Sequence, residues 1–449
     1  MSRAFLRLST FALAVSLVVC SVASAQSPPA QSPPTVTAQD RTAILDDILK
    51  ALNETYVFPE TAKKMEELVR RQAKSGAYDA LSDLESFAAK LTEDLRSVSH
   101  DLHLAVRWAP PPPRGAGGEP PTPEERQARY VAAVRRDNAC FKKIELLTGN
   151  VGYLKLDCFM QAQLGGSTAV AAMAFLAGAD ALIFDLRNNG GGSPSMIQLL
   201  SSYLLGGEEE TTHLNSFYVR RGDRTEQYWT QAWVPGTRMT EVPVFVLVSG
   251  GTFSAAEEFT YNLKNLKRAT IVGETTGGGA HPVDEHRVEG YPVAMSLPFG
   301  RAVNPITGTN WEGTGVVPDV AVPAAEALAV AHARALGAIA EKTQDPEVKQ
   351  SVEFARTVIE GRSQALTLSP AAMAAFVGQY GPRRITLEDG ALWYQRGSGR
   401  KRQLTPLAGD RFLVGDLEDF MLRFEREGER VVRLVGRYAD GSEEGNPRN

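Results

Sequence analysis

Apolar side chains recur every three or four positions from residue 39 to residue 98, with polar side chains between them. The pattern is clearest in Ile44–Leu52, Ala62–Val69 and Leu84–Leu95. A stripe with this spacing becomes buried when the segment forms an amphipathic helix. The pattern therefore predicts a unit of three helices near the N-terminus.

Single alternation of apolar and polar residues follows over residues 102–108, which is typical of a half-buried strand. This strand would complete an N-terminal unit over residues 39–108. The next stretch, residues 109–126, contains runs of proline and glycine and predicts an exposed loop.

Beyond the loop, short apolar runs alternate with helical stretches. The predicted strands cover 151–159, 181–186, 244–249 and 270–273, and the predicted helices cover 167–177, 196–205 and 255–266. Strands and helices that alternate in this way form a mostly parallel sheet covered by helices. The pattern predicts an α/β core over residues 127–325.

The C-terminal third changes character again. Residues 326–372 have a helical, alanine-rich pattern and are expected to form a helical connector. Residues 373–449 contain short alternating runs separated by turn pairs such as Asp389-Gly390, which predicts a small β-rich domain. This tail resembles small lipocalin-like barrels.

The N-terminus has the features of an export signal. Arg3 and Arg7 precede the short apolar run Phe11–Cys20, and Ala23–Ala25 supplies small residues for cleavage. We expect residues 1–25 to be a signal peptide and residues 26–38 a proline- and serine-rich linker. The mature protein would then be periplasmic or extracellular, without an integral membrane anchor. Acylation of Cys20, as in a lipoprotein, is the alternative.

Composition excludes several classes of protein. The chain has 48 Lys and Arg against 53 Asp and Glu, a net charge of −5, which becomes −7 once Arg3 and Arg7 are removed. The sequence has no long basic run, so a nucleic-acid partner is not expected. Three cysteines exclude a disulfide-rich scaffold and any four-cysteine metal site. Cys140 and Cys158 would remain after cleavage, either paired or as two buried thiols.

Two segments could carry chemistry. In Gly250–Glu257 a buried strand ends at two glycines and Ser254 opens a helix, where backbone N–H groups point outward. Such a serine is a candidate nucleophile, although Ser254 with Glu257 also forms a capping-box pattern. In Phe184–Gly192 three glycines follow a strand, which suits an oxyanion hole, a phosphate cradle or simply a tight turn.

These two segments, taken in order, carry a family resemblance. The pattern D-L-R-x-N-x-G-G at Asp185–Gly192, followed by G-x-x-S-A-x-E at Gly251–Glu257, resembles the tail-specific (C-terminal-processing) serine peptidases. The stretch G-E-T-T-G-G-G at Gly273–Gly279 resembles the strand that follows the nucleophile helix in that family. The resemblance implies a core with the ββα spiral of crotonases and Clp proteases.

One departure selects a branch of the family. The lysine-dyad branch has a lysine at the position of Gly279, so the chain resembles instead the branch of tricorn protease and interphotoreceptor retinoid-binding protein. That resemblance implies a Ser/His/Glu triad of Ser254, His103 and Glu312. It also implies an oxyanion hole from Ala255 with Gly191 or Gly190. No metal or organic cofactor is implied.

Several alternatives stay open at this level. His100 competes with His103 as the base, and Glu274 competes with Glu312 as the residue that orients it. A metal site on His100, Asp101 and His103 is conceivable. His281 and His286 lie in an expected hairpin, where His281 is expected to be structural or to face the substrate.

The resemblance implies a serine endopeptidase that cleaves extended polypeptides. Because the retinoid-binding relatives carry apolar ligands on the same fold, a non-catalytic binding protein for apolar ligands or peptides is the alternative.

Overall fold

The computed structural model describes residues 33–110, 121–207, 210–363 and 365–449. The expected signal peptide, most of the expected linker and the centre of the proline-rich stretch lie outside these residues. Among the described helices, none combines the length and apolarity needed to span a bilayer.

The predicted three-helix unit is confirmed. It consists of α1 (Ala38–Thr55), α2 (Pro59–Lys74) and α3 (Leu84–Ser99). Their apolar stripes meet in a common core in which Ile48 and Leu91 are completely buried. The N-cap of α3 is Asp83, whose carboxylate accepts the Ser86 N–H at 2.8 Å. The periodicity thus identified both the helices and the face that each one buries.

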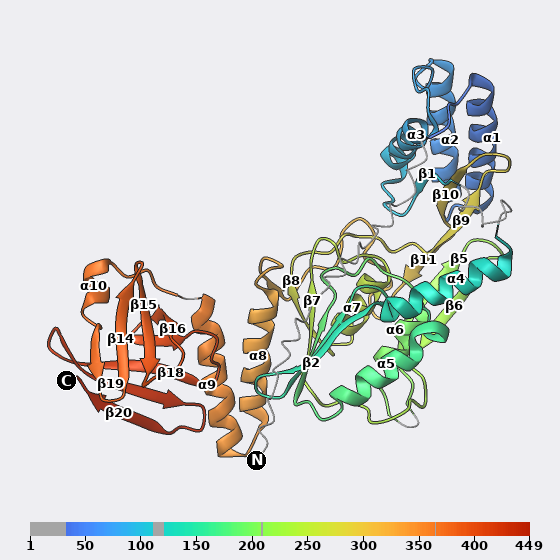
Figure 1. Cartoon of the computed structure of the whole chain (residues 1–449). Coiled ribbons are helices and arrows are strands. Elements are labelled where there is room, and N and C mark those ends of the chain that lie inside the picture. The colour runs from blue at the N-terminus through green and yellow to red at the C-terminus, as the bar shows by residue number, and fades with distance from the viewer. Residues whose placement is uncertain (1–32, 111–120, 208–209, 364) are drawn as a thin grey trace, which may run out of the picture.

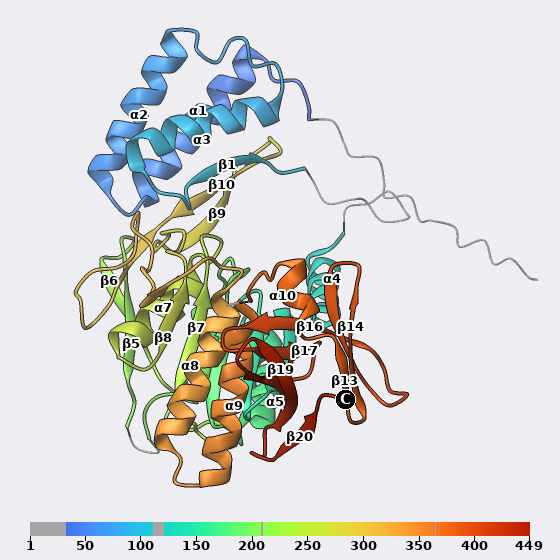
Figure 2. The ribbon, with the colours of Figure 1, turned by 90° about the vertical axis from the view of Figure 1, so that its left-hand side faces the viewer.

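A three-stranded antiparallel sheet closes this unit from below (Figure 2). Its order is β1 (Ala105–Trp108), β10 (Val293–Pro298) and β9 (Val283–Arg287). The strands β9 and β10 belong to a much later part of the chain and reach out of the core, where β10 pairs with β1 and β9 pairs with β10. The N-terminal unit is therefore attached to the core through this sheet.

The strand expected from residue 102 begins three residues later. The Asp101 carboxylate accepts the His103 N–H at 3.0 Å, and the Leu104 N–H donates to the Asp101 carbonyl. These bonds hold Leu102 and His103 in a turn ahead of β1. His103 therefore stands on a turn, where its direction is set by Asp101 and not by the pleat of a strand.

A six-stranded sheet forms the centre of the core. All its neighbouring strands run parallel except the β2–β3 pair, which confirms the predicted parallel α/β core. In spatial order the strands are β12 (Val320–Ala321), β8 (Thr270–Gly273), β7 (Val244–Val248), β4 (Ala181–Asp185), β3 (Val151–Leu156) and β2 (Phe141–Leu147).

Helices cover both faces of this sheet (Figure 1). One face packs against α5 (Ala162–Leu176), α6 (Pro194–Ser202) and α7 (Ala255–Asn265). The other face packs against α8 (Ala327–Lys342), whose alanines allow a close approach to the strands. The first part of the segment expected as a connector is thus α8, a structural layer of the core.

The proline-rich stretch ends earlier than residue 126. Pro123 is the first residue of α4 (Pro123–Arg136), which leads into the short 3₁₀ helix η1 (Asn138–Cys140). The Thr122 hydroxyl accepts the Glu125 N–H at 3.2 Å, and Glu125 accepts the Thr122 N–H in return. This capping box converts the last prolines of the stretch into a helix start.

A second small sheet flanks the α7 side of the core. It has the order β11 (Gly300–Val303), β5 (His213–Val219) and β6 (Arg224–Trp229) and is antiparallel throughout. Figure 1 shows it beside α7. It forms one wall of the cavity described below.

The C-terminal domain is β-rich, as predicted. Its eight strands form an antiparallel meander that follows chain order, and a bridge between Tyr380 and Arg448 links its first and last strands. Two helices, α9 (Pro346–Ser363) and α10 (Pro370–Ala374), precede it. The strands are β13 (Gly378–Tyr380), β14 (Arg383–Glu388), β15 (Ala391–Arg396), β16 (Arg402–Leu407), β17 (Arg411–Val414), β18 (Phe420–Glu427), β19 (Arg430–Tyr438) and β20 (Glu443–Pro447).

Candidate active site

Ser254 stands at the start of α7, at the carboxyl edge of the parallel sheet. Its backbone has φ 54° and ψ −123°, which a residue other than glycine rarely adopts. The side chain is half-buried, and Ser254 forms with Glu257 the capping box that the sequence pattern predicts. A strained turn between a strand and a helix, with the serine hydroxyl at its tip, also suits a nucleophile.

Glu257 is a completely buried carboxylate that ties this turn to its neighbour. It accepts hydrogen bonds from the Ser254 N–H at 2.9 Å, the Gly278 N–H at 2.7 Å and the Gly279 N–H at 2.8 Å. The Thr276 hydroxyl adds a fourth at 2.5 Å. Glu257 therefore holds the nucleophile turn against residues 276–279. Sequence reasoning recognised it only as a cap.

The glycine loop after β4 lies against Ser254. A Cβ placed on Gly191 would come within 2.7 Å of the Ser254 Cβ and 3.1 Å of the Ala255 nitrogen. The Ala255 N–H makes no backbone hydrogen bond to a described residue. The Gly191 N–H donates to the Asn189 side chain at 2.9 Å, whereas Gly190 and Gly192 are exposed. The predicted loop is in place, but Asn189 already engages its central amide.

A disulfide lies next to the segment that hydrogen-bonds to this glycine loop. Cys140 and Cys158 are bonded, with their Cα atoms 5.3 Å apart. Phe159, next to Cys158, donates its N–H to the Gly191 carbonyl at 2.8 Å and accepts the Ser193 N–H at 2.6 Å. The disulfide is therefore linked through one residue to the backbone beside Ser254.

Replacing both Cys140 and Cys158 by serine is expected to lower the free energy of unfolding by about 3 kcal/mol, the chain-entropy value for a loop of 18 residues. Urea unfolding of the wild type in the presence and absence of a reductant, together with the double variant, measures this loss. Equal midpoints for all three samples would contradict it.

His103 reaches the site from the N-terminal unit. Its ring packs on Phe253, the neighbour of Ser254, with ring centroids 4.6 Å apart. Its Nδ1 atom is buried without a hydrogen-bond partner among the described residues. No hydrogen bond joins His103 to Ser254 in this substrate-free structure, where catalytic hydrogen bonds are often long.

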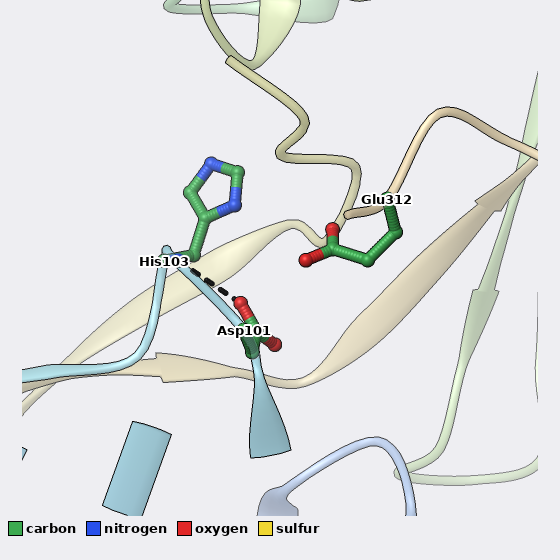
Figure 3. Close-up of side chains that lie close together, drawn as sticks. All are labelled: Asp101, His103 and Glu312. Carbon is green, nitrogen blue, oxygen red and sulfur yellow. Dashed lines mark hydrogen bonds between the residues drawn. The ribbon is translucent and has the colours of Figure 1, made fainter. Parts of the chain in front are cut away.

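Glu312 comes from the turn before β12 and faces His103 (Figure 3). Donor atoms of Asp101, His103 and Glu312 all lie within 4.8 Å of one another. The Glu312 Oε2 atom accepts the Ala280 N–H at 2.5 Å, whereas its Oε1 atom is buried without a partner among the described residues. In Figure 3 a ring nitrogen of His103 lies on the side of this carboxylate. Glu312 and His103 thus lie close together, and each has a buried atom without a partner among the described residues, Oε1 and Nδ1 respectively.

Asp101 and His281 form a second, tighter pair. The Asp101 carboxylate is completely buried and accepts the His281 Nδ1–H at 2.7 Å and the Tyr56 hydroxyl at 3.2 Å. The same His281 nitrogen lies 3.6 Å from the Glu312 Oε2 atom. His281 also lines the cavity beside Ser254.

Burial dominates the electrostatics of this cluster. It lowers the pKa of His103 to about 4, against the opposing effect of Asp101. It raises the pKa of Glu312 to about 7, which His281 opposes and Asp101 reinforces. For Asp101, burial alone would raise the pKa, but the hydrogen bond and charge of His281 leave it lowered. His103 is therefore neutral, and able to accept a proton, over the whole neutral range.

The same three donor atoms could geometrically hold a cation. Asp101, however, already accepts hydrogen bonds from the His103 N–H, His281 and Tyr56. Among the described residues, the buried atoms of the group without a hydrogen-bond partner are His103 Nδ1 and Glu312 Oε1. This donor set fits a histidine–carboxylate pair better than a metal centre, which usually has three or four protein ligands.

Gly279 leaves room for the rings of Phe253 and His103. A Cβ on Gly279 would lie 2.2 Å from the Phe253 ring and 2.6 Å from the His103 Cε1 atom. Any side chain at position 279 would therefore displace the imidazole.

The two rival residues lie outside this cluster. His100 is exposed and caps α3 in a left-handed conformation with φ 55°. Glu274 is exposed and accepts the Ala324 N–H at 2.9 Å, near the start of α8. Neither shares the small space occupied by His103 and Glu312.

Comparison with known proteins gives a consistent picture. The model of peptidase family S41 matches residues 150–322, and the model of the N-terminal domain of Peptidase_S41 in eukaryotic IRBP matches residues 36–144. A carboxy-terminal-processing protease of Bartonella bacilliformis is 29% identical over 185 residues, which are 39% of this chain and 39% of that protein. The chloroplastic C-terminal processing peptidase of Tetradesmus obliquus is 29% identical over 180 residues, 38% of this chain and 34% of that protein.

The matched region is therefore less than two fifths of the length of these curated relatives. Among solved structures, the photosystem II D1 C-terminal processing protease aligns with 64% of this chain and 94% of its own, at 17% identity and a TM-score of 0.39. The tricorn protease aligns with 72% of this chain and 37% of its own, at 14% identity and a TM-score of 0.41.

Proposed function

Because the chain belongs to peptidase family S41, we propose that it is a serine endopeptidase that hydrolyses peptide bonds in extended polypeptides. Ser254 is the nucleophile, His103 the general base and Glu312 the group that orients the base. The observation that carries this assignment is the pair of buried, unpartnered atoms, His103 Nδ1 and Glu312 Oε1, beside the strained turn of Ser254.

In the first step the Ser254 hydroxyl attacks the peptide carbonyl carbon while its proton passes to the Nε2 atom of His103. His103 Nδ1–H then donates to Glu312, which stabilises the imidazolium. Collapse of the tetrahedral intermediate breaks the C–N bond, and His103 returns the proton to the leaving amine. A water molecule, deprotonated by His103, releases the acyl group from Ser254 in the second half of the reaction.

The oxyanion needs donors at the position where its charge develops. The Ala255 N–H supplies one, since it is free of backbone partners among the described residues. The second comes from the glycine loop, where Gly191 lies closest to Ser254 and Asn189 holds its amide in this structure. Substrate binding would draw this N–H from Asn189 or share it with the oxyanion.

Hydrolysis of an unstructured protein such as casein tests the function. The wild type is expected to release new peptides, and a serine-directed inhibitor is expected to stop this release. If the wild type cleaves nothing but is stabilised by fatty acids in a thermal-shift assay, the alternative of an apolar-ligand binding protein would be supported.

The rate should depend on pH through Glu312. Its raised pKa means that the carboxylate is ionised above about pH 7 and protonated below it. We expect kcat/KM to be constant above this pH and to fall about tenfold per unit below it. For the Glu312→Gln variant, kcat/KM is expected to be about 10⁴-fold lower at high pH and not to fall further near pH 7. If kcat/KM of the variant still falls below pH 7 as in the wild type, another group is responsible for the pH dependence.

The disulfide also bears on the compartment. Cys140–Cys158 is of the kind that persists in oxidising surroundings. Together with the signal sequence expected over residues 1–25, it supports action outside the cytoplasm, in the periplasm or the extracellular space.

A further inference from the structure

A cavity of about 300 Å³ opens directly beside Ser254 and Ala255. Its walls come from the nucleophile helix α7, from strands β5 and β6, and from the segment around His281. When Ser254 attacks a peptide carbonyl whose oxygen faces the Ala255 N–H, the residue that carries this carbonyl lies beside the opening of the cavity. The cavity is therefore placed to receive the side chain of the residue whose carbonyl is attacked.

Glu258 lies in the wall of this cavity, one helical turn beyond Ser254. Glu258 is only 3% exposed. No lysine or arginine accompanies it in the cavity wall. Its carboxyl group lies next to the side-chain amide of Asn215, which is also buried. A buried carboxylate without a cationic partner is costly unless a ligand supplies one.

The charges around the cavity are of one sign. Glu226, Glu258 and Asp284 line it, and no lysine or arginine does so. Glu226 is already paired with Arg224 at 2.9 Å on the surface, and Asp284 is exposed at the rim. Glu258 is thus the deepest carboxyl group of the three, and no lysine or arginine in the cavity wall pairs with it.

The remaining walls are apolar and aromatic. Phe217, Val219 and Tyr228 form one side, and Phe299 and Trp311 contribute further rings. Such walls suit the methylene stem of a long cationic side chain, whose charged end would then meet a carboxylate. Glu258 is about 6 Å along α7 from Ser254, since four residues rise 1.5 Å each. A stem of several carbons is needed to cover that distance.

Resting on the proposed peptidase activity, we propose that Glu258 makes this cavity a specificity pocket for lysine or arginine on the N-terminal side of the cleaved bond. The positive end of the side chain pairs with the Glu258 carboxylate, and the stem lies against the aromatic walls. Burial raises the pKa of Glu258 to about 8 in the substrate-free protein, and an approaching cation lowers it again. Glu258 touches the substrate side chain and takes no part in proton transfer.

The test uses peptides that differ only at the residue before the cleaved bond: lysine, arginine, leucine, phenylalanine or glutamine. The wild type is expected to give the highest kcat/KM with lysine or arginine. Glu258→Gln is expected to lower kcat/KM for these two peptides about 30-fold or more, while the leucine peptide changes less than about threefold. Glu226→Gln, the matched change at the rim, is expected to cost the lysine peptide at most about threefold, because exposed ion pairs contribute little.

Cleavage of the leucine peptide at a nearly unchanged rate also shows that Glu258→Gln is folded. Glu258→Met is expected to reverse the preference, so that the leucine and phenylalanine peptides are cleaved best. A wild type that favours leucine, phenylalanine or glutamine, or a preference for lysine that survives in Glu258→Gln, would overturn the pocket assignment and leave the peptidase assignment standing. A wild type that cleaves none of the five peptides and no casein would overturn both.

Discussion

Replacing Ser254 by alanine is expected to lower kcat about a millionfold, the cost of removing the nucleophile of a serine protease. The fold should survive, because Glu257 holds the turn through the Ser254 backbone N–H, which the substitution keeps. Initial rates on casein and on a lysine peptide measure the loss, and the melting temperature shows that the variant is folded.

A matched control lies in the same loop. The Ser249 hydroxyl donates to the Arg187 carbonyl at 2.6 Å and serves the turn after β7. Ser249→Ala is expected to cost about 1 kcal/mol of stability and to keep activity within about tenfold of the wild type. Activity that survives in Ser254→Ala, or that is lost equally in Ser249→Ala, would show that the nucleophile has been misassigned.

Replacing His103 by glutamine is expected to lower kcat about 10⁴-fold or more, because the serine would then lack its base. Gln has no ring nitrogen of suitable basicity, although it can occupy much of the same space against Phe253. The loss should appear in kcat and leave KM nearly unchanged, since the base acts in the chemical step.

Variants of two other histidines, His100 and His281, show whether the loss is specific to His103. His100→Asn retains the left-handed cap of α3, which asparagine tolerates well, and is expected to leave activity unchanged. His281→Gln removes the partner of Asp101 and is expected to give a smaller loss than His103→Gln. If His281→Gln abolishes activity and His103→Gln does not, then the Asp101–His281 pair is the catalytic dyad and our assignment of the base is wrong.

Much of the architecture could be predicted from periodicity. The helices α1 to α3 follow from a stripe of period 3.6, and the strands β4 and β7 follow from short apolar runs between helical stretches. The family resemblance, carried by motifs in Asp185–Gly192 and Gly251–Glu257, is confirmed by the family models that match the core and the N-terminal unit. Local sequence was sufficient here because each of these features is set by residues close together in the chain.

The composition of the site could not be predicted in the same way. His103 and Glu312 meet only because β10 leaves the core and pairs with β1, and that pairing joins residues nearly 200 positions apart. Sequence alone left His100 and Glu274 as rivals. In the structure His100 lies at the end of α3 and Glu274 lies directly after β8, bonded to Ala324, so both are separate from the cluster.

Several residues of the site had no sequence signal of their own. From the sequence, Asp101 was considered only with His100 and His103 as a metal site, because its role in holding His281 depends on a contact across 180 residues. Asn189 occupies the amide of Gly191, which the motif alone presents as free. Glu258 follows the nucleophile motif directly, but its burial in a cavity wall is a tertiary property.

The central claim is that Ser254 is a nucleophile activated by His103. A fluorophosphonate probe, followed by digestion and mass spectrometry, tests it most directly because the probe bonds only to an activated hydroxyl. We expect one adduct per chain, located on Ser254, with labelling at least about 100-fold slower in His103→Gln and absent in Ser254→Ala. Labelling at another residue, or at the same rate in all three proteins, would contradict the account.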